Sequence, residues 1–134
     1  MKKVAKKHIN IDSLKLVNLI RRATLDKKAE DVVALDVRGL CYYADYFVIM
    51  SGHSTRHVQG LAHAVDESLR GKRLNEGNTE GLAEGNWVLL DYDDVIVHIF
   101  YHETREFYDL EGLWHDAPRL SFAMEPEAVG EERS

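Results

Sequence analysis

The sequence has 134 residues, with 17 Lys and Arg against 23 Asp and Glu, which gives a formal net charge of −6. This length fits one domain, and a hydrophobic content of 45% can supply a core, so the composition excludes a wholly disordered chain. Nine Lys or Arg and two Asp lie in residues 1–28. Because the remainder of the chain is acidic, nucleic-acid binding by the surface as a whole is disfavoured.

Cys41 is the one cysteine, so neither an intramolecular disulfide nor a thiolate cluster for a metal can form. The basic start is not followed by an unbroken apolar stretch, and no run approaches the ~20 apolar residues that cross a membrane. These features predict a soluble, cytoplasmic protein without a signal peptide.

The first half of the chain predicts two helices and two strands. Asp12 or Ser13 can cap a helix over residues 13–24, where apolar side chains recur at mostly helical spacing. Residues 32–37 and 46–50 are rich in β-branched or aromatic side chains and are predicted as buried strands. Ser54 or Thr55 can cap a second helix that covers one face of the sheet. Its apolar stripe consists of Val58, Leu61, Ala62, Val65 and Leu69.

The second half predicts a hairpin and a short helix. Residues 71–85 contain four glycines and are predicted as a surface connection, with a short strand near Leu74. Two strands, 87–92 and 95–101, flank an Asp93-Asp94 turn. Thr104 is the expected cap of a final helix. The apolar set of that helix is Phe107, Leu110, Leu113 and Trp114, and Pro118 ends any further helix.

The two faces of the hairpin carry different side chains. If Asp93 and Asp94 form a two-residue loop, Trp87 pairs with Phe100, and alternate residues point to opposite sides of the sheet. One side is aliphatic and predicts a core: Val88, Leu90, Val95, Val97 and Ile99. The other side mixes rings, aliphatic and ionisable groups: Trp87, Leu89, Asp91, Ile96, His98 and Phe100. We interpret this mixed side as a protein-binding surface. Coverage by a helix of the same chain and a homodimer interface are the alternatives.

Two residue patterns suggest a catalytic or metal-binding site. His53 and His57 stand four residues apart, a spacing that can place two imidazoles on one metal, but no further ligand completes the set. Asp91 and Asp93 form the D-x-D of a metal-dependent nucleotidyltransferase. In that class, acidic residues follow a Gly-Ser turn by about a dozen positions, where this chain has the apolar stripe of its helix. The sequence therefore predicts no catalytic residue, metal or cofactor, and a degenerate or active nucleotidyltransferase is the alternative function.

Several separated blocks together resemble the ribosomal silencing factor, or Iojap-like, family. The resemblance runs from about Ile11 to Pro118. Among the blocks that carry it are Ala44-Asp45-Tyr46-Phe47-Val48-Ile49, residues 51–58, Trp87-Val88-Leu89-Leu90-Asp91, residues 94–98 and Arg105-Glu106-Phe107-Tyr108-Asp109-Leu110. The family's hairpin tryptophan, aspartate, acidic turn and histidine correspond to Trp87, Asp91, Asp94 and His98.

The resemblance implies an α/β fold: a single domain with a mixed sheet and flanking helices, nucleotidyltransferase-like but without the catalytic carboxylates. Residues 11–118 would form this domain, residues 1–10 a basic extension and residues 119–134 an acidic, disordered tail. The resemblance also implies binding to the fourteenth protein of the large ribosomal subunit. Such binding blocks docking of the small subunit and represses translation when nutrients are scarce.

The resulting hypothesis is a translation repressor that is not an enzyme. Its expected partner-binding residues are Trp87, Leu89, Asp91, Asp94, Ile96, His98 and Phe100. The apolar members would supply buried area, and the acidic members would meet basic residues of the ribosomal protein. A minor contact with rRNA is an open role for the N-terminal lysines, which are Lys2, Lys3, Lys6 and Lys7.

Overall fold

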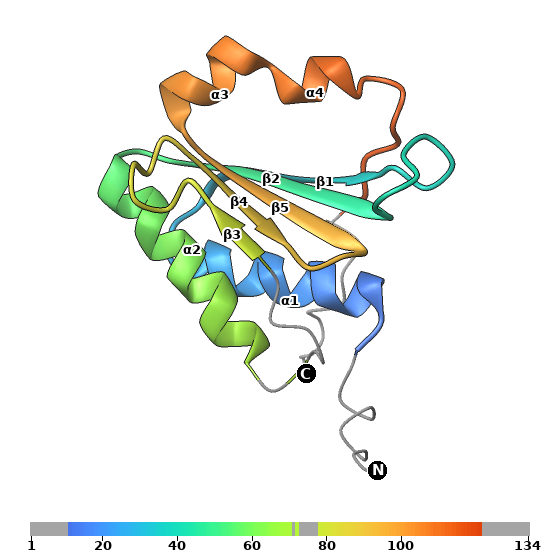
Figure 1. Cartoon of the computed structure of the whole chain (residues 1–134), viewed down its shortest axis with the longest axis horizontal. Coiled ribbons are helices and arrows are strands. Elements are labelled where there is room, and N and C mark those ends of the chain that lie inside the picture. The colour runs from blue at the N-terminus through green and yellow to red at the C-terminus, as the bar shows by residue number, and fades with distance from the viewer. Residues whose placement is uncertain (1–10, 71, 73–77, 122–134) are drawn as a thin grey trace.

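A five-stranded sheet organises the chain, with two layers of helices on its two faces (Figure 1). The computed structural model describes residues 11–70, 72 and 78–121. The strands are β1 (Glu30–Asp36), β2 (Tyr46–Gly52), β3 (Asn78–Glu80), β4 (Trp87–Asp91) and β5 (Val95–Tyr101). The helices are α1 (Ser13–Leu25), α2 (Thr55–Leu69), α3 (His102–Tyr108) and α4 (Leu110–Leu113).

The strands are arranged in the order β1-β2-β5-β4-β3. The central pair, β2 and β5, is parallel, and the other neighbours are antiparallel. The sheet is therefore mixed, which confirms the predicted α/β class with flanking helices. The parallel pair is joined by a long crossover that contains α2, as parallel strands require.

The main core lies between the sheet and the pair α1 and α2, which confirms the prediction that the second helix covers one face of the sheet. Asp12 caps α1 by accepting a hydrogen bond from the Lys15 amide at 2.9 Å, and Ser54 caps α2 through the His57 amide at 3.0 Å. The predicted stripe of α2 is fully buried against the aliphatic side of the hairpin. The hairpin residues on that side are Val88, Leu90, Val95, Val97 and Ile99, each at most 2% exposed.

The register of the hairpin is the predicted one. Trp87 pairs with Phe100 and Asp91 with Ile96, and Asp93 and Asp94 form the turn. Asp93 adopts a positive φ of 75°, which aspartate tolerates in turns better than most residues. Side-chain alternation and the two-residue loop were therefore sufficient to assign both faces of the hairpin.

The C-terminal helix differs from the expectation. Thr104 is not a cap, because α3 starts directly at the end of β5 and Thr104 lies within its first turn. The helix also breaks at Asp109, whose left-handed backbone ends α3 and whose carboxylate caps α4 by accepting from the Gly112 amide. One expected helix is thus two short ones at an angle.

Two further points concern element boundaries. The short strand of the glycine-rich connection is Asn78–Glu80, whereas Leu74 lies outside the described residues. The chain also pairs with β1 beyond Pro118, since the Leu120 amide donates to the Ala34 carbonyl at 2.9 Å.

Residues 1–10 with their four lysines, and the tail from residue 122, lie outside the described residues. Within the described part of the chain, no helix is both long and apolar enough to cross a bilayer.

Candidate protein-binding face

The predicted binding residues lie together on the side of the sheet that faces away from α1 and α2. Six of the seven are cross-strand neighbours on β4 and β5, paired as Trp87 with Phe100, Leu89 with His98 and Asp91 with Ile96. Asp94, the seventh, lies in the hairpin turn. The structure therefore brings the set into one contiguous region. We call it the hairpin face.

Burial divides the hairpin face into two groups. Ile96 and His98 are each 6% exposed and Phe100 is not exposed at all, so these three lie beneath the accessible surface of the face. The reason is that α3 and α4 fold back over this side of the sheet, as Figure 1 shows. The alternative that a helix of the same chain covers the face therefore holds in part. Trp87 and Leu89 remain half-buried.

Trp87 is held by contacts on several sides. Its indole Nε1–H donates a hydrogen bond to Nδ1 of His98 at 3.1 Å. The ring packs against Phe100 and Tyr108, each with a centroid distance of 4.9 Å. Close by, Gly81 has a φ of +83°, and its backbone passes so near the Trp87 carbonyl that a Cβ there would collide with it. The indole thus occupies a defined position while part of it stays accessible.

His98 is a buried neutral base beneath Trp87. Burial lowers the pKa of His98 to about 4, so its imidazole is uncharged near pH 7. It lies edge-on to the Phe47 ring, with a centroid distance of 5.3 Å. His102, by contrast, starts α3 and is exposed.

Exposed aromatic residues extend the accessible surface beyond the hairpin. Tyr108 is 53% exposed and Phe107 is 81% exposed, and their rings are 5.0 Å apart. Of the apolar set expected for this helix, Leu110 and Trp114 pack against the sheet, whereas Phe107 and Leu113 are exposed. The Phe107-Tyr108 pair, standing among charged residues of a short helix, is the signal that sequence reasoning missed.

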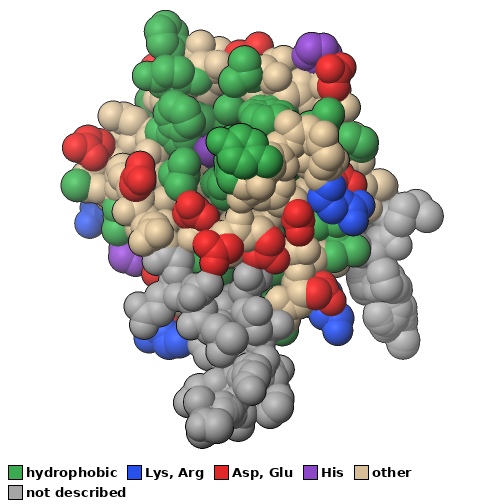
Figure 2. Space-filling model, turned by 45° about the vertical axis from the view of Figure 1, so that its right-hand side comes forward, with side chains coloured by type: hydrophobic (Ala, Val, Ile, Leu, Met, Phe, Trp, Pro, Cys, Tyr) green, Lys and Arg blue, Asp and Glu red, His purple; other side chains and the backbone are tan. Residues whose placement is uncertain are grey.

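Acidic side chains border this apolar region. In Figure 2, hydrophobic side chains gather in the upper half of the molecule, the side on which α3 and α4 lie, and a row of acidic side chains crosses below them. Asp91 and Asp94 are partly exposed and Asp93 is exposed at the hairpin end of the face. An apolar centre with an acidic border suits a basic protein surface.

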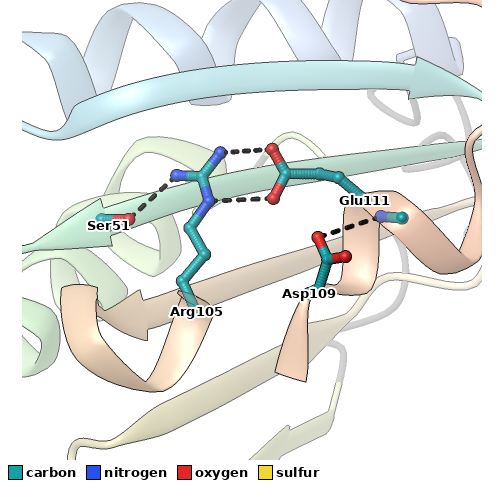
Figure 3. A network of polar contacts seen from close by, with 5 residues as sticks. Ser51, Arg105, Asp109 and Glu111 are labelled. Carbon is teal, nitrogen blue, oxygen red and sulfur yellow. Dashed lines mark hydrogen bonds and ion pairs between the residues drawn. The ribbon is translucent and has the colours of Figure 1, made fainter. Parts of the chain in front are cut away.

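One polar network fastens the covering helices to the sheet (Figure 3). Arg105 on α3 donates from Nε and Nη2 to both carboxylate oxygens of Glu111 on α4, at 3.0 and 2.8 Å. Its Nη1 donates to the Ser51 hydroxyl at 2.9 Å, at the end of β2. The guanidinium holds the pKa of Glu111 below its ordinary value. This Arg105 network joins α3, α4 and β2.

The residues that suggested catalysis have structural partners instead. The Asp91 carboxylate accepts the Asp93 amide at 2.9 Å, so the D-x-D forms the turn. His57 Nδ1 accepts the His53 amide at 3.0 Å, and its Nε2 lies 2.9 Å from the Lys27 carbonyl, so both ring nitrogens are engaged. Among the described residues, no cluster of three His, Cys, Asp or Glu side chains is placed to hold a metal ion.

Comparisons with known proteins agree on one family. Residues 10–134 match the family described as "Ribosomal silencing factor during starvation", a match that includes the acidic tail. A ribosomal silencing factor from Halalkalibacterium halodurans is 41% identical over 105 residues, covering 78% of this chain and 90% of that protein. A mouse protein named "Mitochondrial assembly of ribosomal large subunit protein 1" is 33% identical over 102 residues, covering 74% of this chain and 43% of that protein.

A solved structure shares the fold. The crystal structure of a protein from Chromobacterium violaceum superposes with a TM-score of 0.75 at 31% identity. The superposition covers 90% of this chain and 98% of that one. Nearly all of that chain therefore has a counterpart here.

Proposed function

The chain belongs to the ribosomal silencing factor family, whose members regulate translation on the ribosome, and from this premise we propose that it represses translation by binding the fourteenth protein of the large ribosomal subunit. Once that protein's surface is occupied, the small subunit cannot join. Inhibition is then steric and needs no catalytic step. The action takes place in the cytoplasm and is expected when nutrients are scarce.

The observation that carries this proposal is the position of Trp87. A large ring that is held in place by its own chain and is partly accessible is the arrangement expected of an interface anchor. The acidic border favours a basic partner, and the name of the mouse relative also points to the large subunit.

Within the hairpin face, the proposed roles differ with burial. Trp87 and Leu89 contact the partner, and Asp91 and Asp94 meet its basic side chains. The buried Ile96, His98 and Phe100 act from beneath by supporting those residues. Tyr108, which packs on Trp87, adds to the contact surface.

The experiment that tests this proposal is the substitution Trp87→Ala. We expect affinity for purified large subunits to fall by about 2 kcal/mol or more, which is roughly 30-fold. Titration with the isolated fourteenth protein should show the same loss. Leu14→Ala is the matched control, because Leu14 is a large apolar residue that is 47% exposed on α1.

Two results would contradict the proposal. A folded Trp87→Ala variant that binds large subunits like the wild type would remove the hairpin face from the interface. Ultracentrifugation tests the homodimer alternative. A dimer that persists when the ribosomal protein binds would show that the partner uses another surface.

A further inference from the structure

The side chain of Trp87 makes its one hydrogen bond within the chain. An indole has one donor, its Nε1–H, and no acceptor. That donor is bonded to His98 Nδ1 at 3.1 Å. A partner that packs on Trp87 therefore meets the ring, and the N–H is already occupied.

His98 has a fixed hydrogen-bonding pattern in this place. The imidazole is 6% exposed and is surrounded by rings, with centroids of Phe47, Trp87 and Phe100 at 5.3, 6.0 and 6.3 Å. The neutral form carries one N–H and one acceptor nitrogen. Because Nδ1 accepts from the indole, the proton lies on Nε2.

Packing alone does not explain why residue 98 is a histidine. Its neighbours are aromatic, and a phenylalanine would fill similar volume without burying a polar ring. The contact that distinguishes histidine from phenylalanine is the bond that Nδ1 accepts from Trp87. That bond, together with the ring contacts to Phe100 and Tyr108, limits the indole to one position before any partner arrives.

We propose that His98 is a positioning residue that orients Trp87 for binding, so that the partner contacts the exposed carbon atoms of the indole ring and not its N–H. This inference rests on the proposed function and deepens it. The carboxylates at the hairpin end of the same face, Asp91 and Asp94, favour a basic partner surface, and the aliphatic stem of a Lys or Arg suits the exposed part of the indole. Ordering a free side chain on binding weakens affinity, here by about three- to tenfold if Trp87 is released.

The test compares three substitutions at His98. In asparagine, Oδ1 is attached to Cγ just as Nδ1 is in histidine, so His98→Asn keeps an acceptor near the indole. His98→Gln moves the acceptor to the position of Nε2, and His98→Phe removes it while keeping a ring. His63→Asn is the matched control, because His63 is exposed on α2.

Two readouts are needed, and the full-length chain serves for both. Proton exchange of the Trp87 indole N–H, assigned by its loss in Trp87→Phe, reports the bond by NMR. Titration with purified large subunits reports binding, and thermal melting checks the fold. We expect His98→Phe and His98→Gln to exchange the indole proton faster and to bind about three- to tenfold more weakly. His98→Asn and His63→Asn should stay within about twofold of the wild type in binding.

The outcomes separate this inference from the proposed function. Failure of the wild type to bind large subunits would contradict the proposed function. Normal wild-type binding combined with equally tight binding by a folded His98→Phe would contradict the positioning role alone. If His98→Phe does not fold, equal binding by His98→Asn and His98→Gln contradicts that role instead. Loss of indole protection when the ribosomal protein binds would overturn the inference that the partner contacts the ring and leaves the N–H bonded to His98.

Discussion

The two faces of the sheet are covered in different ways. On one side, α1 and α2 have 13 and 15 residues and bury a continuous aliphatic core against the strands. On the other side, α3 and α4 have seven and four residues, and neither contains a fully buried side chain. They lie over aromatic residues and are fastened by the Arg105 network.

The difference indicates where stability and binding reside. A long amphipathic helix gains most of its stability from the face it buries, so the α1 and α2 side should carry most of the folding free energy. The α3 and α4 side leaves large rings accessible and a polar residue beneath them. We therefore expect substitutions on the α1 and α2 side to affect folding and substitutions on the α3 and α4 side to affect binding.

The largest effect should follow from Ile99→Ala. Ile99 lies on β5, faces α1 and α2 and is fully buried, so truncation should lower the free energy of unfolding by about 3 kcal/mol. Chemical denaturation measures the loss. Phe107→Ala on α3 is the contrasting variant and should change stability by less than about 0.5 kcal/mol, since Phe107 is largely exposed. Equal losses for the two variants would contradict the contrast between the faces.

An intermediate effect is expected at the Arg105 network. Glu111→Gln removes the charge that pairs with Arg105 and should cost about 1–3 kcal/mol. Amide hydrogen exchange should rise in α3 and α4 and stay unchanged in α1. A rise of equal size in α1 would show that the Arg105 network stabilises both faces of the sheet alike, which would contradict the contrast between them.

The same carboxylate gives a pH dependence with a definite sign. Arg105 lowers the pKa of Glu111 below its ordinary value of 4.5 in the folded state. The stabilisation is therefore present above pH 4.5 and is lost as the pH falls through the lower, folded-state pKa. Thermal melting should show that the wild type loses more stability than Glu111→Gln as the pH drops from 5 to below 4. Parallel curves for the two proteins would contradict this.

The smallest effect is expected at the acidic border. Asp94→Asn should weaken binding to large subunits by about 0.2–1 kcal/mol at low salt, and the difference should shrink as salt rises. Glu67→Gln on α2 is the control and should change binding at neither salt concentration. A loss at Asp94 that is independent of salt would argue against a charge contact with the partner.

Much of the fold could be predicted from residue patterns. The apolar stripe of α2 and the caps Asp12 and Ser54 define the helices of the stable face. The Asp93-Asp94 turn and side-chain alternation assign the hairpin register and its two sides. The family, too, follows from separated blocks of sequence.

The coverage of the hairpin face could not be predicted in the same way. Alternation tells which side a residue faces, but not which element packs on that side. The burial of His98 and Phe100 depends on α3 folding back and on the left-handed backbone of Asp109, which splits the expected helix. Short helices give weak periodic signals, so the apolar set of the expected helix did not distinguish the exposed Phe107 from Leu110, which packs against the sheet.

The central claim is that binding excludes the small subunit, and a subunit-joining assay tests it most directly. Purified large subunits are incubated with the wild type or with Trp87→Ala, small subunits are added, and the products are separated by sedimentation. We expect the wild type to lower the amount of assembled ribosomes in proportion to its bound fraction, while Trp87→Ala does not. Wild-type protein that sediments with intact assembled ribosomes would contradict it.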